Sequence, residues 1–572
     1  MFHRQQVHSN LNPIQQNLLT TLRNHPKLVV LNSDKNLGPV LMERETYVCR
    51  CLIDHLLQPT YEHLSFEAAT TFISSTRDSL IEFLTLYRGY LGDDNHKYLT
   101  RSLEAVGDPF SYFYVLAKVH KRPWKTCPIV SVSGSLLYGL GKWLDQQLQP
   151  IIRQLPTYLS SSFQLKEDLD KMAGTNFSNM SIFTGDVIAM YPSINLDDAF
   201  ERIEEFLHHS SLCANVDAGA VMHALRLIMK RNCFRFGDTY WLQKDGTAMG
   251  TPPAPSFATL YYSIFELDLI EQFGSSLHYL RRYIDDQFGI WIHNPDPVVD
   301  QQQWEAFKQC QETYCSLSWE FSPLSKTANF LDVTLDVEQF HINFKLYEKP
   351  LNLHLYIPPN SAHTPAVRMG LVTGGIYRIL QLTTRDCDKK DSLSKFHSHL
   401  FARGYKLPFL KFAFEKALIQ FSKPREKKSK DSTRDYILLH LPFHPCDPPR
   451  HSLQQAFHAH MLHPRTKHRL FGQACDHSQA WHRTHSWNGW DAFIRNDTPV
   501  VPKEKFEPYL YELHNNEKAL IPIKRLIVAY SRAPNLKNLL FPRHVEAKCP
   551  TARQVSTIQA ELLHSLTNAE PN

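Results

Sequence analysis

The stretch "RRYIDDQFGIW" (281–291) places two carboxylates, Asp285 and Asp286, side by side between apolar and aromatic runs. The segments on either side have the residue types of β-strands, so the stretch predicts a β-hairpin whose tight turn presents both acids. Two adjacent like charges in such surroundings are costly unless a cation offsets their repulsion and desolvation. The alternative is an ordinary exposed turn, in which Asp is common.

A third carboxylate, Asp186, follows a strand-like run in "FTGDVIAMYPSI" (183–194). If that strand lies beside the hairpin, the three carboxylates converge; taken alone, the segment is more typical of a capped strand end. Hard oxygen ligands of this kind suit Mg²⁺ or Mn²⁺, with water and substrate phosphates in the remaining positions. Two such ions can activate an attacking 3′-hydroxyl and stabilise a leaving pyrophosphate, so the residues predict a two-metal site.

Length and composition limit the classes of protein to consider. At 572 residues the chain exceeds the size at which one hydrophobic core stops growing, so several domains are expected. Its 43% hydrophobic and 21% charged residues are typical of a globular protein, and the net charge of +5 permits a polyanionic partner without requiring one.

No stretch approaches the roughly 18 apolar residues of a membrane-spanning helix, so no membrane partner is expected. Eleven Cys without a CxxC pair predict an intracellular protein, nuclear or cytoplasmic.

The order of these motifs resembles reverse transcriptases, most closely those of Penelope-like retroelements, which are relatives of telomerase reverse transcriptase. "YIDD" is similar to the Tyr-x-Asp-Asp box of the family, and "FTGDVIAMYPSI" is similar to the palm motif that carries the other catalytic Asp. Five further segments carry the resemblance: "FYVLAKVHKRPWKTCPIVSVSGS" (113–135), "GTAMGTPPAPSFATLYYSIFE" (246–266), "NFLDVTL" (329–335), "YEKPLNLHLYIPPNSAHTPAVRMG" (347–370) and "RLIVAYSRAPNLKNLL" (525–540).

The segment "GGIYRIL" (374–380) matches half of the GIY-YIG nuclease signature that many Penelope-like elements carry. No YIG-like partner follows it in the chain. The sequence therefore predicts no recognisable GIY-YIG endonuclease.

The resemblance implies a fold of the α+β class. It is that of a right-hand polymerase, with fingers, a palm whose antiparallel sheet carries the three Asp, a helical thumb and a C-terminal extension. The implied activity is that of an RNA-directed DNA polymerase, which uses Mg²⁺ or Mn²⁺ to extend a DNA primer on an RNA template with dNTPs. The expected boundaries are 1–30 for an N-terminal helical lead, 31–180 for the fingers, 181–345 for the palm, 346–421 for the thumb, 422–435 for a basic linker and 436–572 for an extension of unknown role.

The resemblance also implies roles around the metals. Asp186 and Asp285 would ligate both ions, Asp286 would support the edge of the site, and the carbonyl of Val187 would be a further ligand. Tyr191 stands where the family has an aromatic gate that excludes a ribose 2′-hydroxyl. The alternative for Tyr191 is an aromatic side chain of the core.

Three residues are expected to contact the dNTP. Lys118 would neutralise phosphate charge, and Gly250, which has no Cβ, would let the backbone approach the nascent base pair. Cys127 stands where the family has an Arg for the base and the α-phosphate, and a thiol offers neither the charge nor the two-pronged donor. The alternative for the whole chain is therefore a catalytically impaired or domesticated retroelement relic that binds nucleic acid.

Contacts to primer and template are expected around the same site. The residues that the resemblance implies for them are Tyr283, the primer-grip residues Phe330 and Leu331, and Lys349, Asn352 and His354 at the start of the thumb. Lys326 is a candidate general acid that protonates the departing pyrophosphate. The alternative for Lys326 is a solvated lysine of a loop.

Overall fold

The structure is a computed structural model that describes residues 11–313, 317–361, 363–422, 436–442 and 525–531. Its described residues form two compact units. The larger unit contains residues 20–354 and 378–394. The smaller unit contains residues 11–19, 355–377 and the described residues from 395 to 531.

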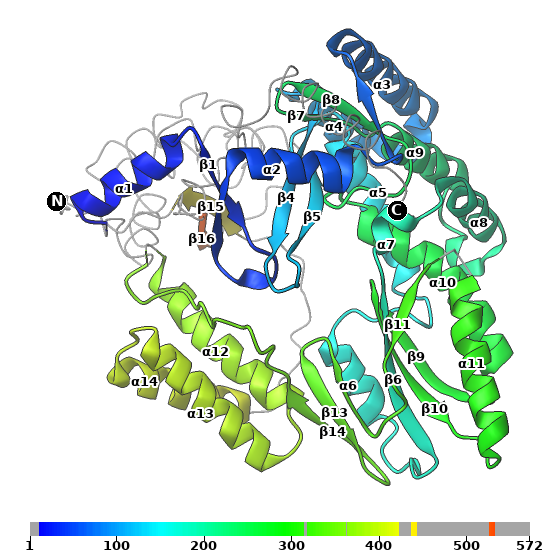
Figure 1. Ribbon diagram of the computed structural model, residues 1–572, viewed down its shortest axis with the longest axis vertical. Helices are drawn as coiled ribbons and strands as arrows, with labels where there is room; N and C mark the ends of the chain where they lie inside the picture. The colour runs from blue at the N-terminus through cyan, green and yellow to red at the C-terminus, as the bar shows by residue number, and fades with distance from the viewer. Residues whose placement is uncertain (1–10, 314–316, 362, 423–435, 443–524, 532–572) are drawn as a thin grey trace, which may run out of the picture. The chain divides into compact units, whose positions relative to one another are not determined.

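The fingers region of the larger unit is built on a five-stranded sheet and a separate hairpin (Figure 1). The sheet has the strand order β3-β8-β7-β4-β5. The residue types of 110–121 and 127–135 predict two strands joined by a basic loop, and β4 and β5 form this pair as an antiparallel hairpin. Two of its strands, β7 and β8, come from the range 181–345 assigned to the palm, so the sheet is discontinuous in sequence. The strands are β1 (Leu28–Asn32), β2 (Pro39–Glu43), β3 (Tyr61–Leu64), β4 (Ser111–Lys118), β5 (Lys125–Ser131), β7 (Cys233–Phe236) and β8 (Thr239–Gln243).

Helices pack around a large apolar core beside this sheet. α5 contains the fully buried Trp143, which contacts Phe83 of α3 edge to face. The amphipathic spacing of 197–208 and 216–231 predicts two helices, which the structure confirms as α8 and α9. The helices are α2 (Arg44–Cys51), α3 (Phe66–Leu86), α4 (Arg88–Glu104), α5 (Tyr138–Ile152), α7 (Met190–Ser193), α8 (Leu196–His209), α9 (Ala218–Lys230) and α10 (Ala254–Phe273).

The palm is a four-stranded antiparallel sheet with the order β11-β6-β10-β9. Side chains alternate between its two faces, because successive residues of a strand point to opposite sides. Ile182 and Phe288 pack into one apolar cluster, whereas Phe183 and Trp291 pack into another with α11. The elements are β6 (Met180–Val187), β9 (Leu277–Tyr283), β10 (Asp286–Ile292), α11 (Pro297–Thr313) and β11 (Trp319–Phe321).

The face of the palm sheet that carries Ile182 and Phe288 is covered by a helix and a small sheet. α6 contributes Leu165 and Leu169 to the apolar cluster, and β12, β13 and β14 form a three-stranded antiparallel sheet beside it. The elements are α6 (Ser162–Asp170), β12 (Thr327–Phe330), β13 (Val333–Val337) and β14 (Ile342–Leu346).

Three helices follow the palm, as expected for a thumb. They are α12 (Pro365–Leu382), α13 (Asp386–Ala402) and α14 (Leu407–Ser422). α1 (Pro13–Asn24) is the first helix of the described chain, and its residues 13–19 belong to the smaller unit. Within that unit, β15 (Tyr436–Pro442) pairs in parallel with β16 (Arg525–Ser531). Residues 423–435 of the expected linker and most of the expected extension lie outside the described residues.

The predicted class is confirmed: the chain is an α+β protein with an antiparallel palm sheet, a preceding region that contains strands, and helices after the palm. The predicted hairpin at 277–292 is also confirmed, with β9 and β10 in antiparallel register. Its turn contains only Ile284 and Asp285, because Tyr283 pairs with Asp286. Asp286 is therefore the first residue of a strand, which corrects the expectation that the turn presents both acids.

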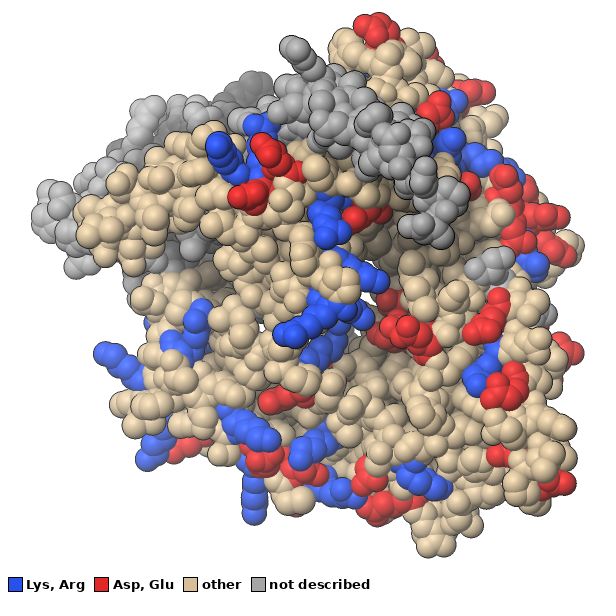
Figure 2. Space-filling view, viewed as in Figure 1, with Lys and Arg blue, Asp and Glu red and all other residues tan. Residues whose placement is uncertain are grey.

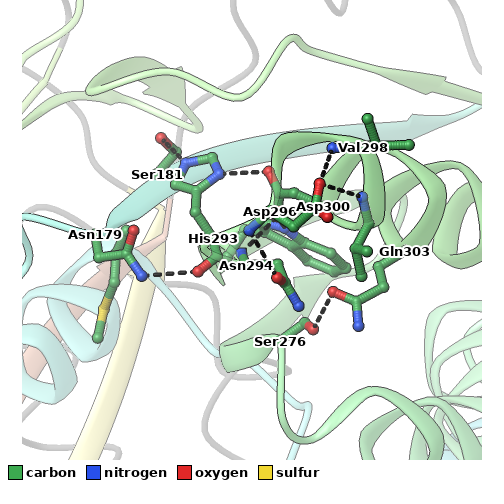
Figure 3. A network of polar contacts seen from close by, with 12 residues as sticks. Asn179, Ser181, Ser276, His293, Asn294, Asp296, Val298, Asp300 and Gln303 are labelled. Atoms are coloured by element: carbon green, nitrogen blue, oxygen red, sulfur yellow. Dashed lines mark hydrogen bonds and ion pairs between the residues drawn. The ribbon is translucent and has the colours of Figure 1, made fainter.

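A polar network closes the end of the palm sheet at which β6 begins and β10 ends (Figure 3). The Asp300 carboxylate, at the start of α11, accepts hydrogen bonds from the Trp291 indole at 3.1 Å and the Asn294 backbone N–H at 3.0 Å. It also contacts the His293 ring at 2.8 Å, and the other ring nitrogen of His293 lies 2.7 Å from the Ser181 hydroxyl. Although burial opposes the change, the hydrogen bonds from His293, Asn294 and Trp291 lower the pKa of Asp300.

We predict that Asp300→Asn destabilises the fold at moderate pH and less so in acid. A lowered pKa means that the ionised carboxylate stabilises the folded state above the unfolded pKa of about 3.9, and that this contribution is lost as the pH falls through the folded pKa. Urea unfolding should show a loss of about 1–3 kcal/mol near pH 5, shrinking toward about pH 3. Glu305→Gln, on the same helix with a 55% exposed side chain, is the control. A loss that is equal at both pH values would contradict the assignment.

Candidate active site

Four residues form one row across the palm sheet. Glu320 pairs with Asp186, Asp186 pairs with Asp286, and Asp286 pairs with Tyr283, each as directly opposite residues of neighbouring antiparallel strands. Directly opposite residues share a face and lie about 5 Å apart. The structure therefore brings Asp186 and Asp286 together as expected. Asp285 lies next to the row, in the exposed turn.

The pKa values of Asp186 and Asp286 are raised by burial and by the neighbouring carboxylates. Partial burial raises the pKa of Asp186, and the charges of Asp285 and Glu320 raise it further. Burial, followed by the charges of Asp285 and Asp186, raises the pKa of Asp286 to about 6. The negative charges thus act on one another, so a cation at this place would relieve their repulsion.

The turn that carries Asp285 has an unusual backbone. Ile284 has φ = 57°, a left-handed conformation that a β-branched residue rarely adopts. The Asp285 carbonyl accepts a hydrogen bond from the Val187 N–H at 3.2 Å, which joins the turn to the end of β6. Such a conformation costs about 1–3 kcal/mol and persists only when its surroundings hold it.

A buried ion pair holds this turn from the opposite face of the sheet. Arg282 and Glu266 are 1% and 3% exposed, and the Arg282 Nε and Nη2 atoms donate to the two Glu266 oxygens at 2.5 and 3.0 Å. Arg282 Nη1 donates to the carbonyl of Ile284 at 2.8 Å. Arg282 Nη2 also donates to Thr259 O and Ser263 Oγ, each at 3.1 Å. The guanidinium thus connects α10 to the strained residue that precedes Asp285.

Tyr191 lies on the short helix α7, directly after β6. Its ring packs against the large apolar core, and burial, followed by the charge of Asp285, raises the pKa of Tyr191 to about 12. The Tyr191 carbonyl accepts from the Thr247 N–H at 2.8 Å. Gly246 (φ = 70°) is required here, because a Cβ would lie 2.7 Å from Pro192 Cα and 2.9 Å from the Tyr191 carbonyl. Tyr191 is therefore a core aromatic that also lies within reach of the Asp285 charge.

The residues expected at the dNTP lie on and beside the fingers hairpin. Lys118 ends β4, and Cys127 of β5 pairs with Leu116. The Cys127 thiol donates to Met249 Sδ at 3.6 Å, and burial raises its pKa, so the side chain is neutral. The Gly250 backbone (φ = 118°) lies so close to β5 that a Cβ would be 2.4 Å from the Val130 carbonyl oxygen. The sequence predicts a close approach of the Gly250 backbone to the nascent base pair. The structure shows a close approach of this backbone to the fingers strand β5.

The expected primer contacts divide into buried and exposed residues. The Phe330 ring is buried in the palm cluster, 5.4 Å from the Phe288 ring centroid, so it supports its turn and offers no side chain to a primer. Leu331 is in that turn, with φ = 52°. Tyr283 is exposed at the end of the acidic row. Lys349 lies near the acids, because its charge partly offsets the rise in the pKa of Asp286.

Asn352 and His354 continue from Lys349 in an irregular segment. The Asn352 N–H donates to the Lys349 carbonyl at 2.9 Å, and the Asn352 side chain accepts from the His354 N–H at 3.0 Å. This local hydrogen bonding defines the path of the chain after β14. The roles of both residues toward a primer or template remain predictions.

The position of Lys326 argues against a general-acid role. Its ammonium donates to the carbonyls of Phe177, Ser178 and Met180, at 2.8 and 3.2 Å for the first two. These carbonyls precede or begin β6, whereas Asp186 is near the end of that strand, about 20 Å away at roughly 3.3 Å per residue. Lys326 is thus not placed to act as the general acid. Its side chain is exposed, as expected for a solvated lysine of a loop, and its ammonium also binds three carbonyls.

Sequence reasoning missed Glu320, Arg282 and Glu266. Glu320 comes from a three-residue strand with no motif around it, and only the register places it beside Asp186. Arg282 had a signal in the sequence, because it immediately precedes Tyr283 in the predicted strand. Successive residues of a strand point to opposite faces, so its side chain is expected on the face opposite to Tyr283. Glu266 ends the quoted Gly-rich segment, but only the packing of α10 on the sheet shows its partner.

The donor set fits a hard divalent cation. Asp186 and Asp285, with the Val187 carbonyl, would hold Mg²⁺ or Mn²⁺, and Asp286 and Glu320 would lie at the edge of the site. All of these ligand atoms are oxygens, which such cations prefer. The Asp186 and Asp286 carboxylates, whose pKa values are raised by neighbouring negative charges, would be stabilised in their ionised form.

Comparisons with known proteins give only distant likenesses. A scan of family models and a search of curated proteins found no match. Among solved structures, the chain is similar to telomerase from Candida albicans in complex with a TWJ fragment of telomeric RNA, with 12% identity, 71% of this chain and 64% of that chain covered and a TM-score of 0.45. It is also similar to apo telomerase from Candida tropicalis (9% identity, 71% and 67%, TM-score 0.40). A third likeness is to the sicinivirus 3Dpol RNA-dependent RNA polymerase (11% identity, 56% and 71%, TM-score 0.33).

The chain thus spans less than two thirds of the Candida albicans chain. Within the described residues, none of the helices is long and apolar enough to cross a membrane.

We predict that the ion pair of Arg282 and Glu266 positions the Asp285 turn. Arg282→Met leaves a buried carboxylate unpaired and should cost about 3–5 kcal/mol of unfolding free energy, whereas Arg282→Met with Glu266→Met should recover most of it. The double variant still lacks the donor to the Ile284 carbonyl. Its rise in Tm on addition of Mn²⁺ should therefore be smaller than that of the wild type.

Arg226→Met with Glu204→Gln, which removes an exposed ion pair, is the matched control. It should change neither the stability by more than about 1 kcal/mol nor the Mn²⁺ effect. A normal Mn²⁺ effect in the Arg282→Met, Glu266→Met double variant would show that the pair does not position the turn.

Proposed function

We propose that this chain is an RNA-directed DNA polymerase, a reverse transcriptase that extends a primer 3′-hydroxyl with dNTPs by a two-metal mechanism. The observation that carries the proposal is the row of Glu320, Asp186 and Asp286, with Asp285 beside it, at an end of the palm sheet to which lysines of the fingers are close. We also propose that the chain comes from a Penelope-like retroelement, on the strength of its ordered motifs.

The chemistry proposed for the site relies on position and charge. The divalent ions, when bound, would lower the pKa of the attacking 3′-hydroxyl and stabilise charge on the leaving pyrophosphate. Asp186 and Asp285 hold the site in place, and Arg282 fixes the backbone of the turn. Lys118 neutralises phosphate charge at the fingers, and Tyr283 supports the primer end. No side chain acts as a nucleophile in this mechanism.

Sugar selection is assigned to Tyr191. The segment of Gly246 and Thr247 holds the Tyr191 backbone, and the ring lies against the core on one side. A large ring fixed in this way would leave no room for a ribose 2′-hydroxyl. The same packing against the core is what the alternative, an aromatic side chain of the core, expects of Tyr191.

A second candidate is a catalytically impaired relic that binds nucleic acid, and Cys127 favours it. The neutral thiol contacts Met249, and it cannot supply the two-pronged charged contact expected of an Arg. Without that contact, nucleotide addition would be slowed, whereas phosphate contacts elsewhere in the chain would still bind a polyanion.

We predict that the purified chain extends a DNA primer on an RNA template with dNTPs and Mg²⁺ or Mn²⁺, and that Asp285→Asn with Asp286→Asn abolishes extension. Loss of two carboxylates removes the charge that holds the ions, so the rate should fall by at least about 10³-fold. Asp170→Asn, at an exposed ion pair of α6, is the control and should extend normally.

If neither the wild type nor the control extends the primer, Cys127→Arg is the next variant. Recovered extension would identify an impaired polymerase. Continued absence of extension, with retained binding of the primer–template duplex in a mobility-shift assay, would favour the relic over the enzyme.

We predict that Tyr191→Ala relaxes sugar selection. Removing the ring opens space for the 2′-hydroxyl, so the ratio of kcat/KM for dNTP to that for rNTP should fall by roughly tenfold or more, measured with the same primer–template. Tyr240→Ala, an aromatic of the same core away from the acidic row, is the control for general loss of packing. An unchanged ratio in Tyr191→Ala would refute the gate.

A further inference from the structure

A rigid loop joins β1 to β2 in the fingers. The Ser33 N–H and hydroxyl both donate to the Gly38 carbonyl, at 3.2 and 2.5 Å. Within the loop, the Asp34 carboxylate accepts from the Lys35 N–H at 2.9 Å, and Lys35 has φ = 57°. The conformation of Lys35 is thus set by hydrogen bonds of the loop itself, and its side chain is exposed.

The loop is attached to the hairpin that carries Lys118. Ser33 forms a parallel bridge with Ala117 of β4. The Asp34 carboxylate lies 4.0 Å from Nε2 of His120, whose side chain is only 9% exposed. Among the described residues, the buried Nδ1 of His120 has no hydrogen-bond partner. The loop and the hairpin tip therefore form one basic surface around His120, which also includes Lys121.

This basic surface faces the acidic row. The pKa values of Asp186 and Asp286 are raised by burial and by neighbouring carboxylates, and the charge of Lys35 partly offsets both rises. The charge of Lys121 partly offsets the rise at Asp186. In the described chain, the Lys35 ammonium forms no ion pair with a carboxylate, so it is available to a ligand. Near the middle of the face seen in Figure 2, a group of Lys and Arg side chains lies beside a group of Asp and Glu side chains.

Lysines opposite a carboxylate cluster that suits divalent cations are suited to a ligand that is itself polyanionic. Phosphate oxygens bind such cations and also bind an ammonium as a point charge. Cys127, on the same hairpin, supplies no charge. The positive charge that a triphosphate requires must therefore come from neighbouring elements.

We propose that Lys35, with Lys121 beside it, binds the β- and γ-phosphates of the incoming dNTP and supplies the charge that Cys127 lacks. This inference rests on the proposed polymerase function and assigns a substrate contact to a loop far from the catalytic motifs in sequence.

The test compares Lys35→Gln, Lys35→Arg and Lys121→Gln with the wild type. Lys35→Gln removes the charge and keeps a polar side chain that is one atom shorter, so KM for dTTP should rise roughly tenfold, with a similar rise in Ki for pyrophosphate as a product inhibitor. Lys121→Gln should produce the same effects to a smaller degree. Lys35→Arg should restore both constants to within a fewfold of the wild type.

Lys27→Gln, at the opposite end of the same β1–β2 hairpin, is the matched control and should leave both constants unchanged. Calorimetric titration with pyrophosphate and Mg²⁺ tests the same contact without turnover. Weaker pyrophosphate binding by Lys35→Gln than by Lys27→Gln supports the inference even in a chain that does not extend a primer. Equal affinities overturn it, and primer extension by the wild type would still support the polymerase.

Discussion

The buried ion pair between Arg282 and Glu266 is the interaction on which the rest of the site depends. It joins α10 to β9 and places a donor on the carbonyl of Ile284, the left-handed residue before Asp285. A buried pair of this kind adds little net stability compared with apolar packing, because desolvation offsets the attraction. Its clear contribution is geometric, since it holds a strained turn that the carboxylate requires.

The alternation of side chains along the strands allows one sheet to serve two purposes. Asp186, Asp286 and Glu320 share a face at one end of the sheet, where solvent and cations have access. Arg282 points to the other face, where α10 supplies its partner. Like charges are thereby gathered on one side, and the structure that holds them in place is built on the other.

The Gly-rich segment 246–250 connects the palm to the fingers. Gly246 packs against the backbone of Tyr191 and Pro192, and Gly250 packs against the carbonyl of Val130 in β5. Both have positive φ, so any other residue would be strained and would also collide with backbone atoms. The position of the Tyr191 ring and the position of the fingers hairpin are therefore set by the same short stretch.

The sequence by itself determined the β9–β10 hairpin, because strand alternation and turn residues are local signals. The α+β class followed from the resemblance of the ordered motifs, and the pairing of the hairpin with the strand of Asp186 came from the structure. The sequence could not show that Phe330 is buried, that Lys326 binds carbonyls far from Asp186, or that Glu320 joins the acidic row. These facts depend on strand register and on packing between segments distant in the chain, which no local pattern encodes. Only the tertiary structure brought Lys35 toward the carboxylates and paired Arg282 with Glu266, because both contacts require separate elements to fold together.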